Sequence, residues 1–180
     1  VEDGARVRNN STLNVADIGS ESSINLSGTQ TTWEQNGNTR VGYFGDGTLN
    51  VSDAAAFGLN GAMTVGYWAQ SEGRVNVSSG GVIEASGALN VGFGGQSAAV
   101  VEISGPGSRV STDAARIGAV RLTGGPATNL GDAGSDAAVH VVNGGLLEVN
   151  NVLGLGAGDV LALNRDVAGN TYVGGQRGRV

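Results

Sequence analysis

Residues 73–81 read GRVNVSSGG, and residues 47–52 carry an earlier copy of the same pattern, GTLNVS. In both copies apolar residues alternate with polar ones, a period of two that is typical of a short β-strand with one buried face. No apolar stripe of helical period survives the frequent glycines, so a helix is not expected. The unit recurs at residues 24–27, 49–52, 75–78 and 101–104, and more loosely at 139–141 and 161–163.

A second unit keeps the same spacing of about 25 residues. It ends in an aliphatic residue and a glycine, at Val41-Gly42, Val65-Gly66, Val91-Gly92, Ile117-Gly118, Leu155-Gly156 and Val173-Gly174. Between the two units each copy carries one larger apolar residue, in turn Trp33, Phe57, Ile83, Val110 and Leu147. Each copy is therefore predicted to form three short strands separated by turns, with the glycines at corners of positive φ.

One copy alone would bury about six apolar side chains, worth on the order of 10 kcal/mol, which is less than the cost of ordering about 25 residues. Stability must come from stacking successive copies, whose equivalent strands pair in parallel. Crossovers between parallel strands are nearly always right-handed. The sequence thus predicts an all-β fold, a single-stranded right-handed parallel β-helix (solenoid) of about seven rungs.

The predicted β-helix forms one segment over residues 1–180. It comprises a degenerate rung at 1–23, regular rungs at 24–118, a loop insertion at 119–138 and further rungs at 139–180. Stacking also predicts outward ladders of like residues that exchange side-chain hydrogen bonds between rungs. These are an asparagine ladder, Asn25, Asn50 and Asn76, and a serine ladder, Ser27, Ser52, Ser78 and Ser104.

Composition excludes several classes of function. All ten basic residues are Arg, they are scattered, and the net charge is −6, so neither nucleic acid nor an anionic membrane is an expected partner. No stretch approaches the roughly 20 apolar residues of a membrane span. The absence of Cys excludes disulfides and thiolate metal sites. Residues 154–161 resemble a calcium nonapeptide only once, without the neighbouring repeats such sites need, and no cofactor or metal is expected.

The copies at 47–52 leading to 63–66, and at 73–81 leading to 89–92, resemble the type V secretion (autotransporter) and PEP-CTERM-associated repeat of passenger domains. The resemblance covers about residues 24–156. It implies a structural or adhesive β-helical passenger segment of a bacterial surface or secreted protein. The implied location is extracellular or at the cell surface. The implied partners are host or neighbouring-cell surface molecules, protein or glycan, or the chain itself.

Two places are candidate contact sites. Aromatic residues follow the corner glycines of successive copies, at Tyr43, Phe44, Tyr67, Trp68 and Phe93. If these rings face outward, they are suited to contact the faces of sugars or another protein. If they do not, they stack on one another and hold the corner together. The second candidate is the long connection at 119–138, which contains Arg121, Asn129 and Asp132, since long excursions from a rigid scaffold often carry function.

A carbohydrate-binding or polysaccharide-processing β-helix enzyme is the alternative. Such an enzyme needs carboxylates that converge on one cleft. Here they are dispersed, with Glu84 and Glu148 predicted in one column and Glu102 on another. We therefore expect no enzymatic activity, and a pure spacer is the remaining possibility.

Overall fold

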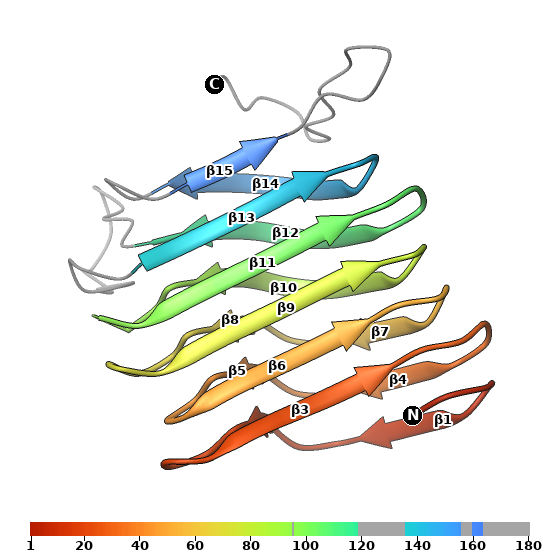
Figure 1. Cartoon of the computed structure of the whole chain (residues 1–180), viewed down its shortest axis with the longest axis horizontal. Helices are drawn as coiled ribbons and strands as arrows, with labels where there is room; N and C mark the ends of the chain where they lie inside the picture. The colour runs from red at the N-terminus through yellow and green to blue at the C-terminus, as the bar shows by residue number, and fades with distance from the viewer. Residues whose placement is uncertain (95, 119–135, 156–159, 164–180) are drawn as a thin grey trace.

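The computed structural model describes residues 1–94, 96–118, 136–155 and 160–163, and every regular element in these ranges is a β-strand (Figure 1). The strands are β1 (Arg6–Asn9), β2 (Leu13–Val15), β3 (Glu21–Leu26), β4 (Thr32–Gln35), β5 (Thr39–Val41), β6 (Asp46–Val51), β7 (Ala56–Leu59), β8 (Met63–Val65), β9 (Glu72–Ser78), β10 (Val82–Val91), β11 (Ala98–Ser104), β12 (Arg109–Ile117), β13 (Asp136–Val142), β14 (Leu146–Leu155) and β15 (Val160–Leu163).

The strands form two parallel sheets that lie face to face (Figure 1). One sheet has six strands in the order β15-β13-β11-β9-β6-β3, and the other has nine, built from β1, β4, β7, β10, β12 and β14 together with the short β2, β5 and β8. The chain passes from one sheet to the other and back, advancing by one strand each time. The predicted all-β parallel solenoid is confirmed. The count of seven rungs is not, because the described residues supply six strands to the six-stranded sheet and residues 164–180 lie outside them.

The strand register reproduces the columns predicted from the repeats. The first unit aligns Ile24, Leu49, Val75, Val101, Val139 and Leu161. The larger apolar residues align as Trp33, Phe57, Ile83, Val110 and Leu147, with Val7 one rung earlier. The residues before the corner glycines align as Val15, Val41, Val65, Val91, Ile117 and Leu155. The copies are therefore stacked rung on rung.

The prediction of three strands per copy is correct for the early copies and wrong for the later ones. Strands β4 and β5 are separate, as are β7 and β8, but β10 runs unbroken through both positions with an irregularity between Ala85 and Ala88. Strands β12 and β14 are also continuous. Asn36-Gly37-Asn38 and Asn60-Gly61 are strong turn formers, whereas residues 85–88 hold two Ala, one Ser and one Gly, which permit a bulge within a strand.

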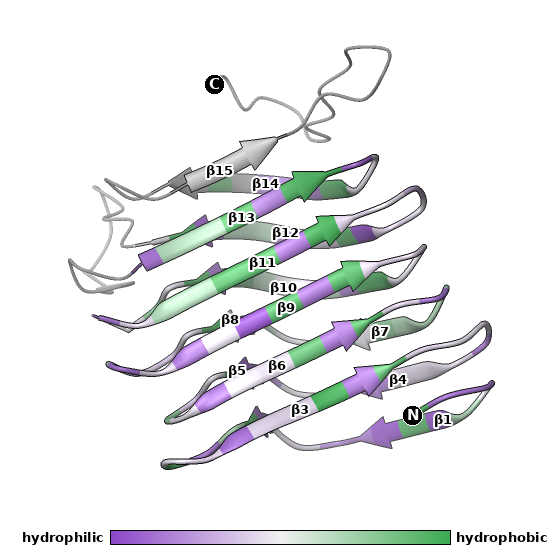
Figure 2. Cartoon of the chain, in the orientation of Figure 1, coloured by the Kyte–Doolittle hydropathy of each residue, from purple (hydrophilic) through white to green (hydrophobic). Residues whose placement is uncertain are grey.

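The hydrophobic core is a thin layer between the two sheets. Burial alternates along each strand. Val51, Val77 and Ile103 are fully inaccessible, whereas the residue that precedes each of them on its strand faces outward. The same alternation is visible as bands of hydropathy along β6, β9 and β11 (Figure 2). Phe57, at 0% exposure, is the largest fully buried side chain among the described residues. Most other core positions hold Val, Leu, Ile or Ala, as the composition predicts.

The corners have the conformation predicted for glycine. Gly42, Gly66, Gly92 and Gly118 have φ between +67° and +71°, a region that costs residues with a Cβ about 1–2 kcal/mol. At Gly42 a Cβ would also lie 2.2 Å from the carbonyl oxygen of Glu72 on a neighbouring rung. Close approach between rungs, as well as the turn, therefore requires glycine here.

The long connection lies mostly outside the described residues, which resume at Asp136. Strand β13 begins there and pairs with β11, with Asp136 opposite Ala98. Regular structure thus returns three residues before the predicted resumption at Val139. Arg121, Asn129 and Asp132, proposed as contact residues, lie outside the described residues, as does the predicted Val173-Gly174 corner.

Candidate functional site

The asparagine ladder is present and hydrogen-bonded. The Asn76 side-chain amide donates to Asn50 Oδ1 at 2.7 Å, and the Asn50 amide donates to Asn25 Oδ1 at 2.6 Å. The column continues with Glu102 and His140 on the next two rungs. For the serine ladder the described residues show no side-chain bond from one rung to the next, and Ser52 Oγ instead donates to the neighbouring Asp53. The asparagine ladder ties rungs together, which is a structural role.

Five aromatic residues gather at one corner of the solenoid, and we name Tyr43, Phe44, Tyr67, Trp68 and Phe93 the aromatic corner. They are placed by the backbone: the N–H of Tyr67 donates to the carbonyl of Gly42, and the N–H of Phe93 donates to that of Gly66. Each residue after a corner glycine therefore lies one rung above its equivalent. This is the stacking that the repeat predicts.

The inner row of the aromatic corner consists of Tyr43, Tyr67 and Phe93, all half-buried. Ring centroids are 5.1 Å apart both for Tyr43 and Tyr67 and for Tyr67 and Phe93. The guanidinium of Arg40 lies over the two tyrosines, 4.7 and 4.8 Å from the ring centroids. Such aromatic and cation–π contacts each stabilise by about 0.5–1.5 kcal/mol. This row holds the corner together.

The outer row faces solvent. Phe44 and Trp68 stack with centroids 5.1 Å apart and planes inclined by 10°, yet they are 39% and 45% exposed. Ile18, at the corresponding place one rung earlier, is 79% exposed. Gly94 follows Phe93 on the next rung, so the row ends at Trp68. The two roles weighed for these rings are thus divided, with the inner row structural and the outer row available for contact.

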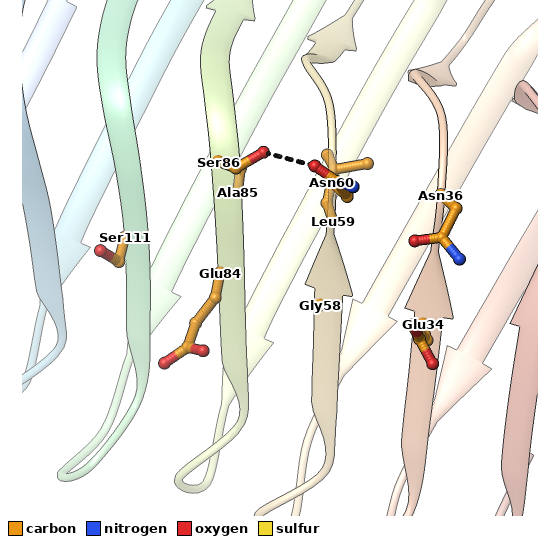
Figure 3. A pocket seen from close by; sticks show the side chains of 9 residues that line it. All are labelled: Glu34, Asn36, Gly58, Leu59, Asn60, Glu84, Ala85, Ser86 and Ser111. Atoms are coloured by element: carbon orange, nitrogen blue, oxygen red, sulfur yellow. Dashed lines mark hydrogen bonds between the residues drawn. The ribbon is translucent and has the colours of Figure 1, made fainter.

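A second feature is a groove of about 550 Å³ on the outer surface of the nine-stranded sheet. Its lining residues are Glu34, Asn36, Gly58, Leu59, Asn60, Glu84, Ala85, Ser86 and Ser111 (Figure 3). The strand register places Glu34, Gly58, Glu84 and Ser111 side by side on β4, β7, β10 and β12. The groove lies where Gly58 leaves this column without a side chain.

The two groove carboxylates are each engaged by an arginine on the far side from Gly58. Arg8 on β1 contacts Glu34 at 2.7 Å, and Arg109 on β12 pairs with Glu84. Arg109 also lies 3.9 Å from Glu148, so the predicted column of Glu84 and Glu148 is present and is bridged by a cation. The Glu34 and Glu84 side chains are 52% and 61% exposed. The two carboxylates that line the groove are therefore each balanced by an arginine outside the lining, in an open setting.

Sequence reasoning did not identify this groove. The signal was available, because Glu34, Gly58 and Glu84 each directly follow the larger apolar residue of their copy, Trp33, Phe57 or Ile83 in turn. Reading that neighbouring position across copies would have shown a glycine between two carboxylates. The contributions of Arg8 and Arg109 depend on the strand register and are not visible in the repeat.

Among the residues that the structure describes, no three His, Asp or Glu side chains lie close enough together to hold a metal ion. The same residues contain no helix that could span a membrane. Comparison with known proteins gives no matching family model, no matching curated protein and no matching solved structure.

Proposed function

We propose that this chain is a structural and adhesive segment of a bacterial surface or secreted protein, a rigid right-handed β-helical rod that presents binding surfaces outside the cell. The resemblance of its repeats to autotransporter passenger repeats supports this proposal. Its partners are surface molecules of host or neighbouring cells, or other copies of the chain. The right-handed winding follows from the general preference of parallel crossovers.

The observation that carries the adhesive role is the outer row of the aromatic corner. Ile18, Phe44 and Trp68 account for three of the four exposed large hydrophobic residues in the described part of the chain. They occupy equivalent places on three successive rungs, which makes one stripe of exposed apolar surface. Aromatic side chains on a rigid support are enriched among residues that dominate binding energy.

Rigidity comes from the rungs beneath the stripe. The aromatic corner stands on the β5–β6, β8–β9 and β10–β11 connections, and each flanking strand is paired in parallel with neighbours. Phe44 and Trp68 are also fixed by edge contacts to Tyr43 and Tyr67, at 4.4 and 5.8 Å between centroids. A side chain already held in place loses little conformational entropy on binding.

The experiment compares fluorescent beads coated with the wild-type chain and with a Phe44→Ser/Trp68→Ser variant. The beads are mixed with one another to score clumping and with bacterial and epithelial cells to score attachment. We expect wild-type beads to clump or attach, and the variant to do so about tenfold less, as expected for the loss of about 1.4 kcal/mol. A Thr48→Ser/Arg74→Ser variant is the matched control, because this pair is also outward and adjacent on two rungs.

Wild-type beads that neither clump nor attach would leave the chain as a spacer and contradict the adhesive role.

Carbohydrate binding or polysaccharide processing is the second candidate function, and the groove at Gly58 favours it. Two strand spacings separate Glu34 from Glu84, about 9.5 Å between backbones, but both side chains are exposed and each is engaged by an arginine. Release of reducing ends from polysaccharides by the wild-type chain, lost in a Glu84→Gln variant, would favour the enzyme.

A further inference from the structure

Gly58 is a glycine that neither the backbone nor its surroundings require. Each of the other glycines whose surroundings are known within the described residues either has positive φ or would bring a Cβ within 3.0 Å of another atom. Gly58 has no positive φ. The nearest atom to an added Cβ is the carbonyl oxygen of Trp33 at 3.8 Å, an ordinary contact. A Cβ would therefore fit without strain.

Glycine in the middle of a strand is destabilising relative to alanine, because it loses more conformational freedom on folding. Gly58 lies inside β7, between Phe57 and Leu59, two residues buried in the core. A strand glycine often marks a place where a ligand or another backbone approaches closely. No other segment of the described chain lies within 3.4 Å of where its Cβ would be, so the space over Gly58 is open to the close approach of a ligand.

The missing side chain opens the groove between Glu34 and Glu84. In Figure 3 the strand at Gly58 is bare between these two residues, and Glu84 leans toward the strand of Ser111. The ion pairs with Arg8 and Arg109 hold both carboxylates on the sides away from Gly58. The floor of the groove is thus uncovered, and the two negative charges are balanced by two positive ones.

We propose that the groove around Gly58 binds a neutral oligosaccharide. Its lining combines carboxylate acceptors with amides and hydroxyls that both donate and accept, a set that suits the hydroxyl groups of sugars. Asn60 accepts a hydrogen bond from Ser86 at 3.2 Å, and the Asn36 amide donates to Asn10 at 2.9 Å, so these side chains are oriented in advance. The volume lies in the range of small-molecule sites.

Charge distinguishes a neutral sugar from other ligands. An anionic ligand would meet the carboxylates of Glu34 and Glu84, and a metal ion would find them already paired with arginines. The groove is also separate from the aromatic corner, since its lining residues lie on β4, β7, β10 and β12 or directly after β4 and β7, and none of the five corner residues is among them. The proposal therefore deepens the second candidate function, carbohydrate binding at this groove, and it can succeed or fail independently of the adhesive role.

The test is a glycan array of neutral and acidic oligosaccharides, followed by calorimetric titration of the best neutral ligand into wild-type chain and three variants. Gly58→Thr fills the floor of the groove with a residue that favours strands. Ala138→Thr makes the same kind of change at an outward position of the opposite sheet. Trp68→Ser removes the exposed ring of the aromatic corner.

We expect a neutral glycan to bind the wild-type, Ala138→Thr and Trp68→Ser chains with the same affinity. We expect the same glycan to bind the Gly58→Thr chain about tenfold more weakly or not at all. The melting temperature of Gly58→Thr should equal or exceed that of the wild type, so that unfolding cannot explain the loss. The proposal is overturned if no neutral glycan binds, if only acidic glycans bind, if Gly58→Thr binds as well as the wild type, or if Trp68→Ser abolishes binding.

Discussion

Asn76 and Asn50 lie one rung apart and share a hydrogen bond of 2.7 Å between their side-chain amides. Asn50 is the central member of the ladder, since it also donates to Asn25. An Asn50→Ala variant loses both bonds, and we expect the free energy of unfolding to fall by about 1–2 kcal/mol. Urea denaturation followed by circular dichroism measures the change.

The matched control is Ser52→Ala, which changes an outward residue next along the same face. Its hydroxyl bonds only to the adjacent Asp53 within the described residues, so we expect a change within about 0.5 kcal/mol. Equal losses for Asn50→Ala and Ser52→Ala would show that the ladder adds nothing beyond an ordinary surface residue.

Replacing glycine by alanine should have opposite effects at two positions. Gly42→Ala puts a Cβ at φ +70° and 2.2 Å from the Glu72 carbonyl oxygen, and we expect a loss of at least about 2 kcal/mol. Gly58→Ala meets no obstruction and should raise the free energy of unfolding by about 0.4–1 kcal/mol. Thermal and urea denaturation measure the stability of both variants. A Gly58→Ala variant less stable than the wild type would contradict the backbone described for β7.

The core should be sensitive to shortening of Phe57. This side chain is fully buried and stacks with Trp33 at 6.0 Å between centroids. We expect Phe57→Ala to cost about 3–5 kcal/mol because it leaves a cavity between the sheets. Phe57→Leu keeps most of the volume and should cost less than the alanine variant. Chemical denaturation ranks the two, and similar small losses for both would place Phe57 outside the core.

The two tryptophans should differ in their access to solvent. Trp33 packs against the core and its Nε1–H donates to the buried Gln35 at 3.3 Å, whereas Trp68 is 45% exposed. We expect acrylamide to quench the fluorescence of Trp68, observed alone in Trp33→Phe, more strongly than that of Trp33, observed alone in Trp68→Phe. Equal quenching would contradict the exposure of the outer row and weaken the adhesive proposal.

The sequence predicted those parts of the fold that every copy repeats. The alternation around Leu49 and Val51 and the single large residue at Phe57 recur on each rung, so comparing copies was enough to align the core. The corner glycines were equally visible, because φ near +70° leaves glycine strongly preferred. The placement of the aromatic rings one rung apart followed from the same periodicity.

What was missed depends on departures from the repeat. The fusion of two strands into β10 follows from a weaker turn at residues 85–88, which differs from the earlier copies by only a few side chains. Gln35 points inward and is fully buried, although the same column holds Leu59 and Ala85 on the next two rungs. Its amide donates to the Ser11 carbonyl and its Oε1 accepts from Asn9, partners that only the folded first rungs bring together.

The asparagine ladder has a consequence for how the chain finds its native pairing. Identical rungs are interchangeable, so a strand displaced by one whole copy would recover the same ladder bonds and nearly the same core. Glu102 and His140 end the run of asparagines, and the cluster of Gln35 with Asn9 and Ser11 occurs once in the described residues, between the first two rungs. Because these residues occur only once, a slipped pairing loses their contacts and differs in stability from the native pairing. Duplicated copies that lacked such marks would fold into a mixture of registers.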